Sequence, residues 1–562
     1  MGGVQCLLGC AAAWLLISAN AEAQQQVEAE RFVVTSGHRT ASLAGLDVLR
    51  GGGNVVDAAI AVSLAIGVAE PCGSGLGGGF VMLYREAASG NVYCLQACPS
   101  APAGFDARHF VRLPLNKRRY GWASVGVPSL PAGLWAAYQR WGSRPWAELV
   151  EPAVRLAEDG VEVDEKMRRL FTPDDRRLRT DAEASRFYLV GGHTLPAGSY
   201  MKNADLAATL RRFAADGANG FYRGETAEMI VAAAQVHGSP LSHADLEAYR
   251  PQFVRPLAAS YRGNQVFTSP PPQIGGLTLL LALKALEKQP WGRAAPRDAE
   301  YVDSISRVLA AVHPKAERVG ADIAEAEGAA RSLLANASIA DILAKASALV
   351  PGRARAVVES PGQTSDDRAD ASTTHLVIAD RDGNVVSLTQ TLSLHYGAGV
   401  MAPGAGILLN NSLSNFSVTM SHAANYAAPG KRPRSTVAPI IVTRWNRPSI
   451  ALGLPGGQRI PTTAVQLMVD VLDFGLPLPE AIAQRRFHLR RPLKPEDPVN
   501  MLDVEGLPPR TTRDQLASDG WRMIVQRPDG HFFGGATAVA YQKNGTMLGV
   551  ADLRRSNLAL GE

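Results

Sequence analysis

The stretch from residue 374 to residue 392 constrains the fold more than any other part of the chain. Two alternating runs, "THLVIAD" and "VVSLTQTL", are joined by a turn at Asp382, Gly383 and Asn384. Alternation with a period of two indicates strands, and such a turn is typical of a β-hairpin. More strand-like runs follow ("PIIVTRW", "SIALGL", "ATAVAY"), whereas helical patterns dominate before residue 350. A helix-rich first part and a strand-rich second part predict layers of helix over sheet.

A glycine-rich stretch, "PCGSGLGGG" (71–79), lies between an Ala-rich helical pattern and the strand-like run "FVMLY". Gly73, Gly75 and Gly78 satisfy the G-x-G-x-x-G pattern of dinucleotide sites. That motif needs a strand before the glycines and a helix after them, and here the order is reversed. We therefore predict a tight turn that allows close backbone packing, and no cofactor.

Composition and charge indicate a globular protein and argue against nucleic-acid binding. Of the 562 residues, 46% are hydrophobic and 19% are charged, as in globular proteins, and the net charge is only +5. Basic residues cluster briefly in "NKRRY" (116–120) and "RRFHLRR" (485–491) without an aromatic pattern between them, so both are interpreted as solvated surface. Nucleic-acid binding is not expected.

The N-terminus resembles a secretory signal peptide over residues 1–23. The apolar run "CLLGCAAAWLLIS" is too short to span a bilayer, and Ala21-Glu22-Ala23 fits a small-x-small cleavage site before Gln24. No basic residue precedes the run, which a start codon assigned too late or a weak signal would explain. "LLGC" also matches a lipoprotein box, but the apolar run continues beyond it. A periplasmic or secreted location is predicted, without a stable membrane span.

Cysteine usage is compatible with export. Cys6 and Cys10 would leave with the signal peptide, and the remaining Cys72, Cys94 and Cys98 permit one disulfide and one free thiol. His and Cys do not recur at the spacing of zinc or iron ligands, so no metal site is predicted.

The residues just before the hairpin supply a reason for a threonine at its start. Residues 350–372 are polar, lack hydrophobic periodicity and contain two Pro-Gly dipeptides, which indicates an exposed flexible segment. They form either a domain linker or a segment that the chain cuts. Threonine is a poor nucleophile unless a base takes its proton, and an N-terminal threonine carries that base as its own α-amine. Cleavage before Thr373 would create such a residue.

Long motifs across the chain resemble those of the gamma-glutamyltransferases, which are N-terminal-nucleophile hydrolases. In the second part these are "TTHLVIADRDGNVVSLTQTL", "GILLNN", "KRPRST" and "GLPGGQRIPTT"; in the first part they include "PCGSGLGGGF", "PWAELVEPAVRLAEDG", "DLEAYRPQFVRPLAASYRG" and "PPPQIGG". The resemblance covers nearly the whole chain after residue 23, in order. It implies an α+β fold, an αββα sandwich with two antiparallel sheets between helical layers.

The resemblance also implies self-cleavage between Ser372 and Thr373. The products would be a heavy chain, 24–372, and a light chain, 373–562, which stay associated as a heterodimer in one intertwined domain. Thr373 would be the nucleophile and its new α-amine the general base.

Other candidate site residues match family positions one by one. Thr391 matches the threonine that hydrogen-bonds the nucleophile, and Gly456 and Gly457 match the pair whose N–H groups hold the oxyanion. Ser435 and Thr436 match a Ser-Ser pair that contacts the glutamyl α-carboxylate. Asn410 and Asn411 are interpreted as turn caps and His375 as a packed strand residue, outside the catalytic set.

Positions that recognise glutamate depart from the family pattern. Leu95, in "CLQACP", stands where the family has an arginine for the substrate α-carboxylate, and Gln96 stands at the following glutamate. Asn415, in "NNSLSNF", replaces the aspartate that binds the α-ammonium group. Ser412 replaces a glutamine, and Ser393 stands where an asparagine is frequent. These charge-assisted contacts are the strong ones in such a pocket; another arginine entering the pocket would restore one of them.

The sequence therefore predicts a self-processing threonine enzyme that transfers an acyl group from a small amide to water or an amine. The family default is the γ-glutamyl group, as in glutathione hydrolysis. The alternative enzyme is an acylase for a glutaryl or neutral acyl amide, because the glutamate clamp is replaced. An inactive relative that only binds is the alternative of another class, and retention of Thr373, Thr391, Gly456 and Gly457 argues against it.

Overall fold

The structure is a computed structural model that describes residues 24–172, 175–353, 373–418, 421–492, 496–528 and 530–562. The predicted signal peptide, most of the segment 350–372 and Ser372 lie outside the described residues. No described helix is both long and apolar enough to cross a membrane.

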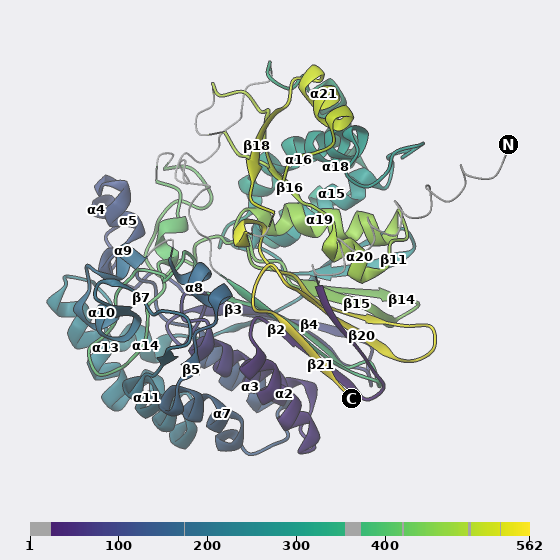
Figure 1. Cartoon of the computed structure of the whole chain (residues 1–562). Helices are drawn as coiled ribbons and strands as arrows, with labels where there is room; N and C mark the ends of the chain where they lie inside the picture. Colours follow the sequence, from purple (N-terminus) through teal and green to yellow (C-terminus); the bar gives the residue numbers. More distant parts are fainter. Residues whose placement is uncertain (1–23, 173–174, 354–372, 419–420, 493–495, 529) are drawn as a thin grey trace.

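Two antiparallel sheets of seven strands each form the centre of the molecule (Figure 1). Sheet A has the order β1 (Gln24–Ala29), β20 (Met547–Asp552), β19 (Thr537–Tyr541), β15 (Arg447–Gly453), β14 (Ile440–Arg444), β11 (Asn264–Thr268) and β10 (Leu257–Tyr261). Sheet B has the order β21 (Leu558–Gly561), β2 (Phe32–Ser36), β12 (Thr374–Asp380), β13 (Val385–Thr391), β3 (Gly79–Arg85), β4 (Val92–Ala97) and β9 (Gln252–Val254). Each sheet combines strands from before and after residue 373.

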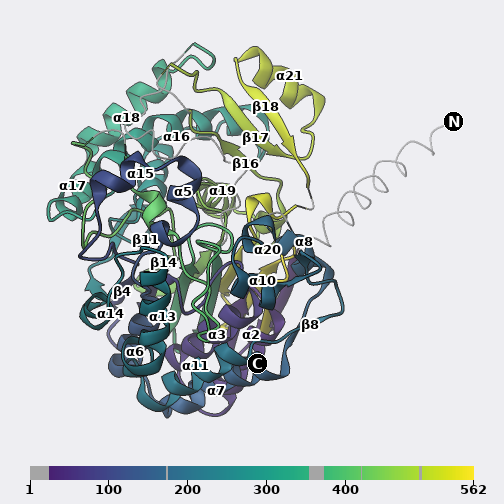
Figure 2. The same ribbon diagram turned by 90° about the vertical axis from the view of Figure 1, so that its left-hand side faces the viewer.

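Helices cover the outer face of each sheet, so the predicted α+β architecture with an αββα layering is confirmed (Figures 1 and 2). On sheet B, the helices α2 (Arg39–Arg50), α3 (Val55–Ala69) and α6 (Leu130–Trp141) contact the strands, while α7 (Trp146–Asp159) packs on α3 and α11 (Ala204–Asp216) packs on α7. On sheet A, α15 (Ile274–Leu286) contacts β10 and β11, and α16 (Ala299–Val319), α18 (Asn336–Ala348) and α19 (Arg459–Leu472) pack on α15.

Shorter elements complete the chain around these layers. The short helices are α4 (Ala107–Arg112), α5 (Leu115–Arg119), α8 (Glu165–Phe171), α9 (Asp175–Leu178), α10 (Ala182–Tyr188), α12 (Asn219–Tyr222), α13 (Gly224–Val236), α14 (His243–Ala248), α17 (Ala326–Leu333), α20 (Leu478–Ala483) and α21 (Arg510–Ser518). A three-stranded sheet consists of β16 (Phe487–Leu489), β17 (Met501–Glu505) and β18 (Arg522–Gln526). The short strands are β5 (Val161–Glu162), β6 (Leu189–Val190), β7 (His193–Thr194) and β8 (Tyr200–Met201).

The predicted hairpin is the pair β12–β13 in the middle of sheet B. Thr374 pairs with Gln390 and His375 with Thr389, and Gly383 in the turn has a φ of 93°. A φ in this range favours glycine, which explains why the turn contains one. Every other side chain of β12 and β13 points toward sheet A, and the remaining ones point toward the helices.

The glycine-rich stretch after α3 forms the predicted tight turn. Gly67 in α3 lies so close to Gly75 that an added Cβ would be 3.0 Å from the Gly75 Cα. The chain then enters β3, which pairs with β13. The predicted order helix–turn–strand is confirmed, and it is the reverse of the order in the dinucleotide motif.

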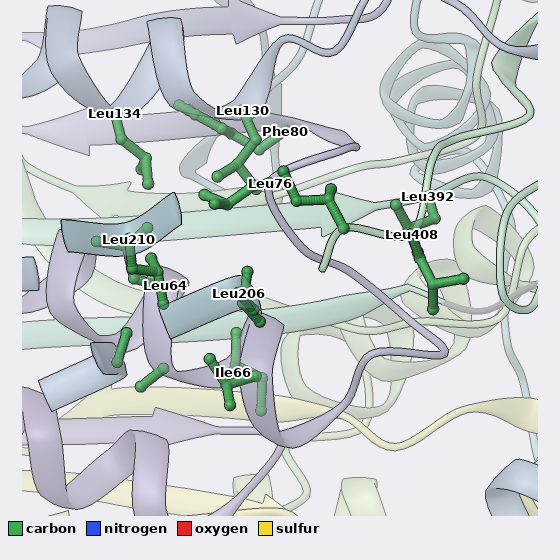
Figure 3. Packing of buried hydrophobic residues seen from close by; sticks show 14 of the residues in the cluster. Leu64, Ile66, Leu76, Phe80, Leu130, Leu134, Leu206, Leu210, Leu392 and Leu408 are labelled. Carbon is green, nitrogen blue, oxygen red and sulfur yellow. The ribbon is translucent and has the colours of Figure 1, made fainter. Parts of the chain in front are cut away.

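Buried side chains separate into three main clusters that correspond to the layers. One fills the space between sheet B and its helices, one lies between sheet A and its helices, and a smaller one lies between the sheets. Figure 3 shows leucines of the first cluster from α3, α6 and α11, together with Leu392 and Leu408 from the region after β13. Cys94 and Cys98 belong to the inter-sheet cluster as free buried thiols, so the disulfide that the sequence permits does not join them.

We predict that Gly453→Ala destabilises the protein because of contact between the sheets. An added Cβ at Gly453 would lie 2.3 to 2.6 Å from three atoms of the buried His375 ring. Overpacking of this kind costs about 1–3 kcal/mol, measured as the free energy of unfolding in urea.

The control is Gly328→Ala in the exposed part of α17. A Cβ there meets no atom within 4 Å, so the higher helix propensity of alanine predicts stabilisation of up to about 1 kcal/mol. Equal effects at the two positions would contradict this account of the inter-sheet contact.

Candidate active site

Thr373 lies immediately before β12 and is 3% exposed. Its hydroxyl donates a hydrogen bond of 3.1 Å to the Oγ1 of Thr391, the last residue of β13. The hairpin register causes this contact, because continuing the pairing of His375 with Thr389 by two residues brings Thr373 opposite Thr391. Two hydroxyls that are 18 residues apart in sequence are thereby fixed side by side.

Thr391 also organises the chain that follows β13. Its Oγ1 accepts a second hydrogen bond, of 2.8 Å, from the backbone N–H of Ser393. Ser393 has a φ of 85°, a left-handed conformation that a non-glycine residue adopts only where its surroundings hold it. The Ser393 hydroxyl in turn accepts a bond of 2.9 Å from the side-chain amide of Asn415. Thr373, Thr391, Ser393 and Asn415 therefore form one continuous hydrogen-bonded chain.

Gly456 and Gly457 lie between the end of β15 and the start of α19. Their φ values of 137° and 58° are in the range that favours glycine. Neither N–H group donates a hydrogen bond to any residue in the described part of the chain. Such N–H groups ahead of a helix can bind an anion. The glycine pair follows Gly453, the last residue of β15. Gly453 packs on the ring of His375, and His375 follows Thr373 by two residues.

A cavity lies beside Thr391, and the empty space in and around it amounts to about 380 Å³, part of which is open solvent. It brings together Thr391 with the predicted substrate-binding residues Ser393, Ser412, Asn415 and Ser435. The other lining residues are Gly79, Phe80, Val81, Cys98, Pro99, Gln273, Thr389, Pro433, Arg434 and Val437. No acidic residue is among the described residues that line it. Arg434 is its one charged residue, and its Nη1 donates to the carbonyl of Glu317 in α16.

Leu95, predicted to stand in the substrate site, is not among the described residues that line this cavity. It is fully buried in the cluster between sheet B and the helices. Alternation along β4 turns Cys94 and Cys98 toward the space between the sheets and Leu95 to the opposite face. Thr436 is buried and is also absent from the lining, although its neighbours in sequence, Ser435 and Val437, line the cavity.

Several residues of the cavity wall were not predicted from the sequence, among them Cys98, Gln273 and Arg434. Gln273 Nε2 donates a hydrogen bond of 3.0 Å to the Cys98 sulfur, and burial raises the pKa of the Cys98 thiol to about 12. The thiol is therefore a neutral, unreactive part of the wall. The alternation of side chains along the strand that begins at Val92 could have predicted that Cys98 faces the other sheet. Gln273 lies outside any strand, so no such signal exists for it.

Asn410 and Asn411, interpreted from the sequence as turn caps, hydrogen-bond to backbone groups far away in the chain. Asn410 donates to the carbonyls of Gly77 and Gly126. Asn411 donates to the carbonyl of Arg119 and accepts from the Leu394 N–H. These bonds connect the loop after β13 to the first part of the chain, next to the cavity.

His375 is buried between the sheets rather than placed in the cavity. Its Nδ1 lies 2.8 Å from the Thr389 hydroxyl and its Nε2 lies 3.3 Å from the Ser387 hydroxyl. Burial lowers the pKa of His375 from 6.5 to about 3. The ring is thus neutral at ordinary pH, and the prediction that it is a packed strand residue agrees with its surroundings.

Comparison with known proteins identifies the class. The gamma-glutamyltranspeptidase family matches residues 41–561. A glutathione hydrolase proenzyme of Pseudomonas sp. (strain A14) is 30% identical over 86% of this chain and 85% of its own. The acylase ACY 1 proenzyme of Pseudomonas sp. (strain V22) is 31% identical over 93% of this chain and 92% of its own. Cephalosporin acylase from Bacillus halodurans has a TM-score of 0.85 and 26% identity over 96% of this chain and 97% of its own.

The fold and these relatives define an N-terminal-nucleophile hydrolase, as the resemblance implied. The chain belongs to the gamma-glutamyltranspeptidase family. It is accordingly an enzyme of the gamma-glutamyltranspeptidase and acylase group, and the alternative of an inactive binding relative falls away.

We predict that His375 makes the protein less stable in acid. Its pKa is about 3 in the folded protein and 6.5 when exposed, so between these values the unfolded chain binds the extra proton. Its contribution to stability is complete above pH 6.5 and is lost as the pH falls toward 3. The slope is about 1.4 kcal/mol per pH unit, measured by urea unfolding at pH 7, 6, 5 and 4.

His375→Gln should remove this part of the acid slope while lowering stability at neutral pH. Thr389→Val is the control, because it deletes the hydrogen-bond partner and keeps the titrating ring. It should lower stability at every pH with the acid slope retained. An unchanged slope in His375→Gln would contradict the assignment.

Proposed function

We propose that the chain cuts itself between Ser372 and Thr373 and then uses Thr373 to transfer acyl groups. In the first step the Thr373 hydroxyl attacks the Ser372 carbonyl carbon, its proton passes to the amide nitrogen, and the C–N bond between Ser372 and Thr373 breaks. The ester that forms is hydrolysed by water, which leaves a carboxylate on Ser372 and a free α-amine on Thr373. The heavy chain, 24–372, and the light chain, 373–562, remain together as a heterodimer because both contribute strands to each sheet.

In the second step the new α-amine acts as general base for its own hydroxyl. The Thr373 oxygen attacks an amide substrate, the amine leaves with a proton, and an acyl-enzyme ester remains. Water or an acceptor amine then releases the acyl group. Thr391 holds the nucleophile, and the N–H groups of Gly456 and Gly457 stabilise the oxyanion.

One observation carries this proposal: the hydroxyl of buried Thr373 donates to Thr391, and Thr391 itself lines the cavity. A nucleophile, its support and a space for substrate therefore meet at one end of the hairpin. The relatives named proenzymes agree with a chain that matures by cleavage. The N-terminal pattern supports a periplasmic or secreted enzyme.

The charges of the cavity favour an acylase as the second candidate function. A glutamyl substrate carries an α-ammonium group, and none of the described cavity residues is acidic. Asn415 can hydrogen-bond a neutral group or a carboxylate, but it offers no charge to an ammonium ion. The relatives include an acylase and a cephalosporin acylase as well as glutathione hydrolases. A glutaryl or neutral acyl group therefore fits this wall better than a glutamyl group.

We predict that Thr373→Ala abolishes self-cleavage. The purified wild-type protein should separate into two chains on a denaturing gel, and mass spectrometry should find a light chain that begins at Thr373. The alanine variant should remain one chain because the attacking oxygen is absent. Thr373→Ser is the matched control; it retains the hydroxyl and should still split. A single intact wild-type band, or splitting of the alanine variant, would refute the mechanism.

We predict that the mature enzyme cleaves glutaryl anilide at least as well as γ-glutamyl anilide. The two substrates differ only in the α-ammonium group, whose unpaired burial costs about 2–5 kcal/mol. The ratio of their kcat/KM values measures this preference directly.

Asn415→Asp tests the cause, since it places a carboxylate where the amide now lies. It should raise kcat/KM for γ-glutamyl anilide relative to glutaryl anilide by about tenfold or more, equivalent to about 1.4 kcal/mol. A wild-type enzyme that strongly prefers γ-glutamyl anilide would reject the acylase candidate and leave the cleavage mechanism intact.

A further inference from the structure

Thr373 is held on its backbone as well as through its hydroxyl. Arg555, between β20 and β21, is 4% exposed, and its Nη1 donates a hydrogen bond of 2.9 Å to the Thr373 carbonyl oxygen. The same peptide group leads into β12. Arg555 therefore places a buried positive charge directly behind the candidate nucleophile, on an element that lies 182 residues away in sequence.

A buried acid accompanies this arginine. Glu70, the residue after α3, is 1% exposed. A Cβ added at Gly37 would lie 2.5 Å from the Thr374 hydroxyl and 2.7 Å from Glu70 Oε2. The end of β2 therefore brings the hydroxyl of Thr374 and the carboxyl of Glu70 against the same point, and only glycine leaves room for both.

The electrostatics of the two groups are coupled. Burial raises the pKa of Glu70, while the charge of Arg555 and the hydroxyl of Thr374 lower it. Burial lowers the pKa of Arg555, and the charge of Glu70 raises it. Asp164, Cys72, Asp552 and His395 are the other titratable groups that interact with the pair.

Burial of an arginine and a carboxyl is costly unless they compensate each other. The acylation steps proposed above use neither residue, and neither lines the cavity beside Thr391. The two residues come from opposite ends of the chain and converge on the two consecutive residues Thr373 and Thr374.

We propose that Glu70 and Arg555 are positioning residues that orient Thr373, before and after cleavage, for attack. Arg555 fixes the Thr373 carbonyl, Glu70 balances the guanidinium charge and contacts Thr374, and together they stop rotation of the residue that carries the nucleophile. This inference rests on the proposed function of Thr373 as an N-terminal nucleophile.

The pair also sets the charge around the new α-amine, which lies within roughly 4 Å of its own carbonyl oxygen by covalent geometry. A nearby guanidinium disfavours the protonated amine, so Arg555 helps to keep the base free, whereas Glu70 opposes it. Loss of Arg555 should therefore raise the pKa of the amine, and loss of Glu70 should lower it.

The experiment compares Glu70→Gln and Arg555→Gln with wild type, using full-length protein. The rate of chain splitting is followed on gels, and kcat and KM of the split enzyme are measured against pH with the better anilide. We expect slower splitting and a kcat lowered about 10- to 100-fold, as for a misplaced catalytic group, with KM changed by less than about threefold. The acid limb of the kcat profile should move up by about one pH unit in Arg555→Gln and down in Glu70→Gln.

Two further variants separate positioning from a loss of folding stability. Arg555→Lys retains the charge and should return the acid limb to its wild-type position. Arg297→Gln breaks an ion pair with the buried Asp470 near the far end of α19; it should lower stability and leave kcat and the acid limb unchanged.

Wild-type kcat and an unmoved acid limb in Glu70→Gln, which is nearly isosteric, would overturn the proposal even if Arg555→Gln does not fold. A shift of the acid limb in the same direction in Glu70→Gln and in Arg555→Gln would also overturn the proposal. A wild-type protein that neither splits nor cleaves an anilide would instead reject the proposed function, and this inference with it.

Discussion

The hydrogen bond between the hydroxyls of Thr373 and Thr391 depends on the register of one hairpin, and the arrangement of the site depends on that bond. Shifting β12 against β13 by one residue would turn Thr373 toward the helices and expose the inter-sheet cluster to polar side chains. The register is held on both sides, because β2 pairs with β12 and β3 pairs with β13. Thr373, the proposed nucleophile, is thus fixed next to a central strand by the packing of the whole sandwich rather than by a loop.

The same register explains how much of the site the sequence could predict. The alternation in 374–391 and the turn at Gly383 predict the hairpin. The family motifs predict the site residues Thr373, Thr391, Gly456, Gly457 and Ser435. The structure places Thr373 against Thr391 and puts Ser435 in the cavity wall. Local pattern succeeds here because both threonines belong to one supersecondary unit.

Matching a family position does not by itself place a residue in the wall of this cavity. Leu95 aligns with an arginine that contacts substrate, yet the period of β4 turns its side chain to the helical side. Glu70 and Arg555 were missed for a different reason: 485 residues separate them, and neither lies in a motif that marks a charge pair. Only the closing of both sheets brings them to Thr373 and Thr374.

The distribution of charge is the feature that distinguishes this site. Buried charge lies behind the proposed nucleophile, in Glu70 and Arg555, while the described cavity wall is formed by hydroxyls, amides, a neutral thiol, apolar groups and the guanidinium group of Arg434. The charge of Arg555 would act on every substrate alike, because the guanidinium group hydrogen-bonds to the carbonyl of Thr373 and not to the substrate. A charge in the wall would select among acyl groups. In this proposal Glu70 and Arg555 orient the attacking residue, and acyl selection is left to shape, hydrogen bonding and Arg434. That division allows the acyl group to differ from glutamate without changing how Thr373 is held.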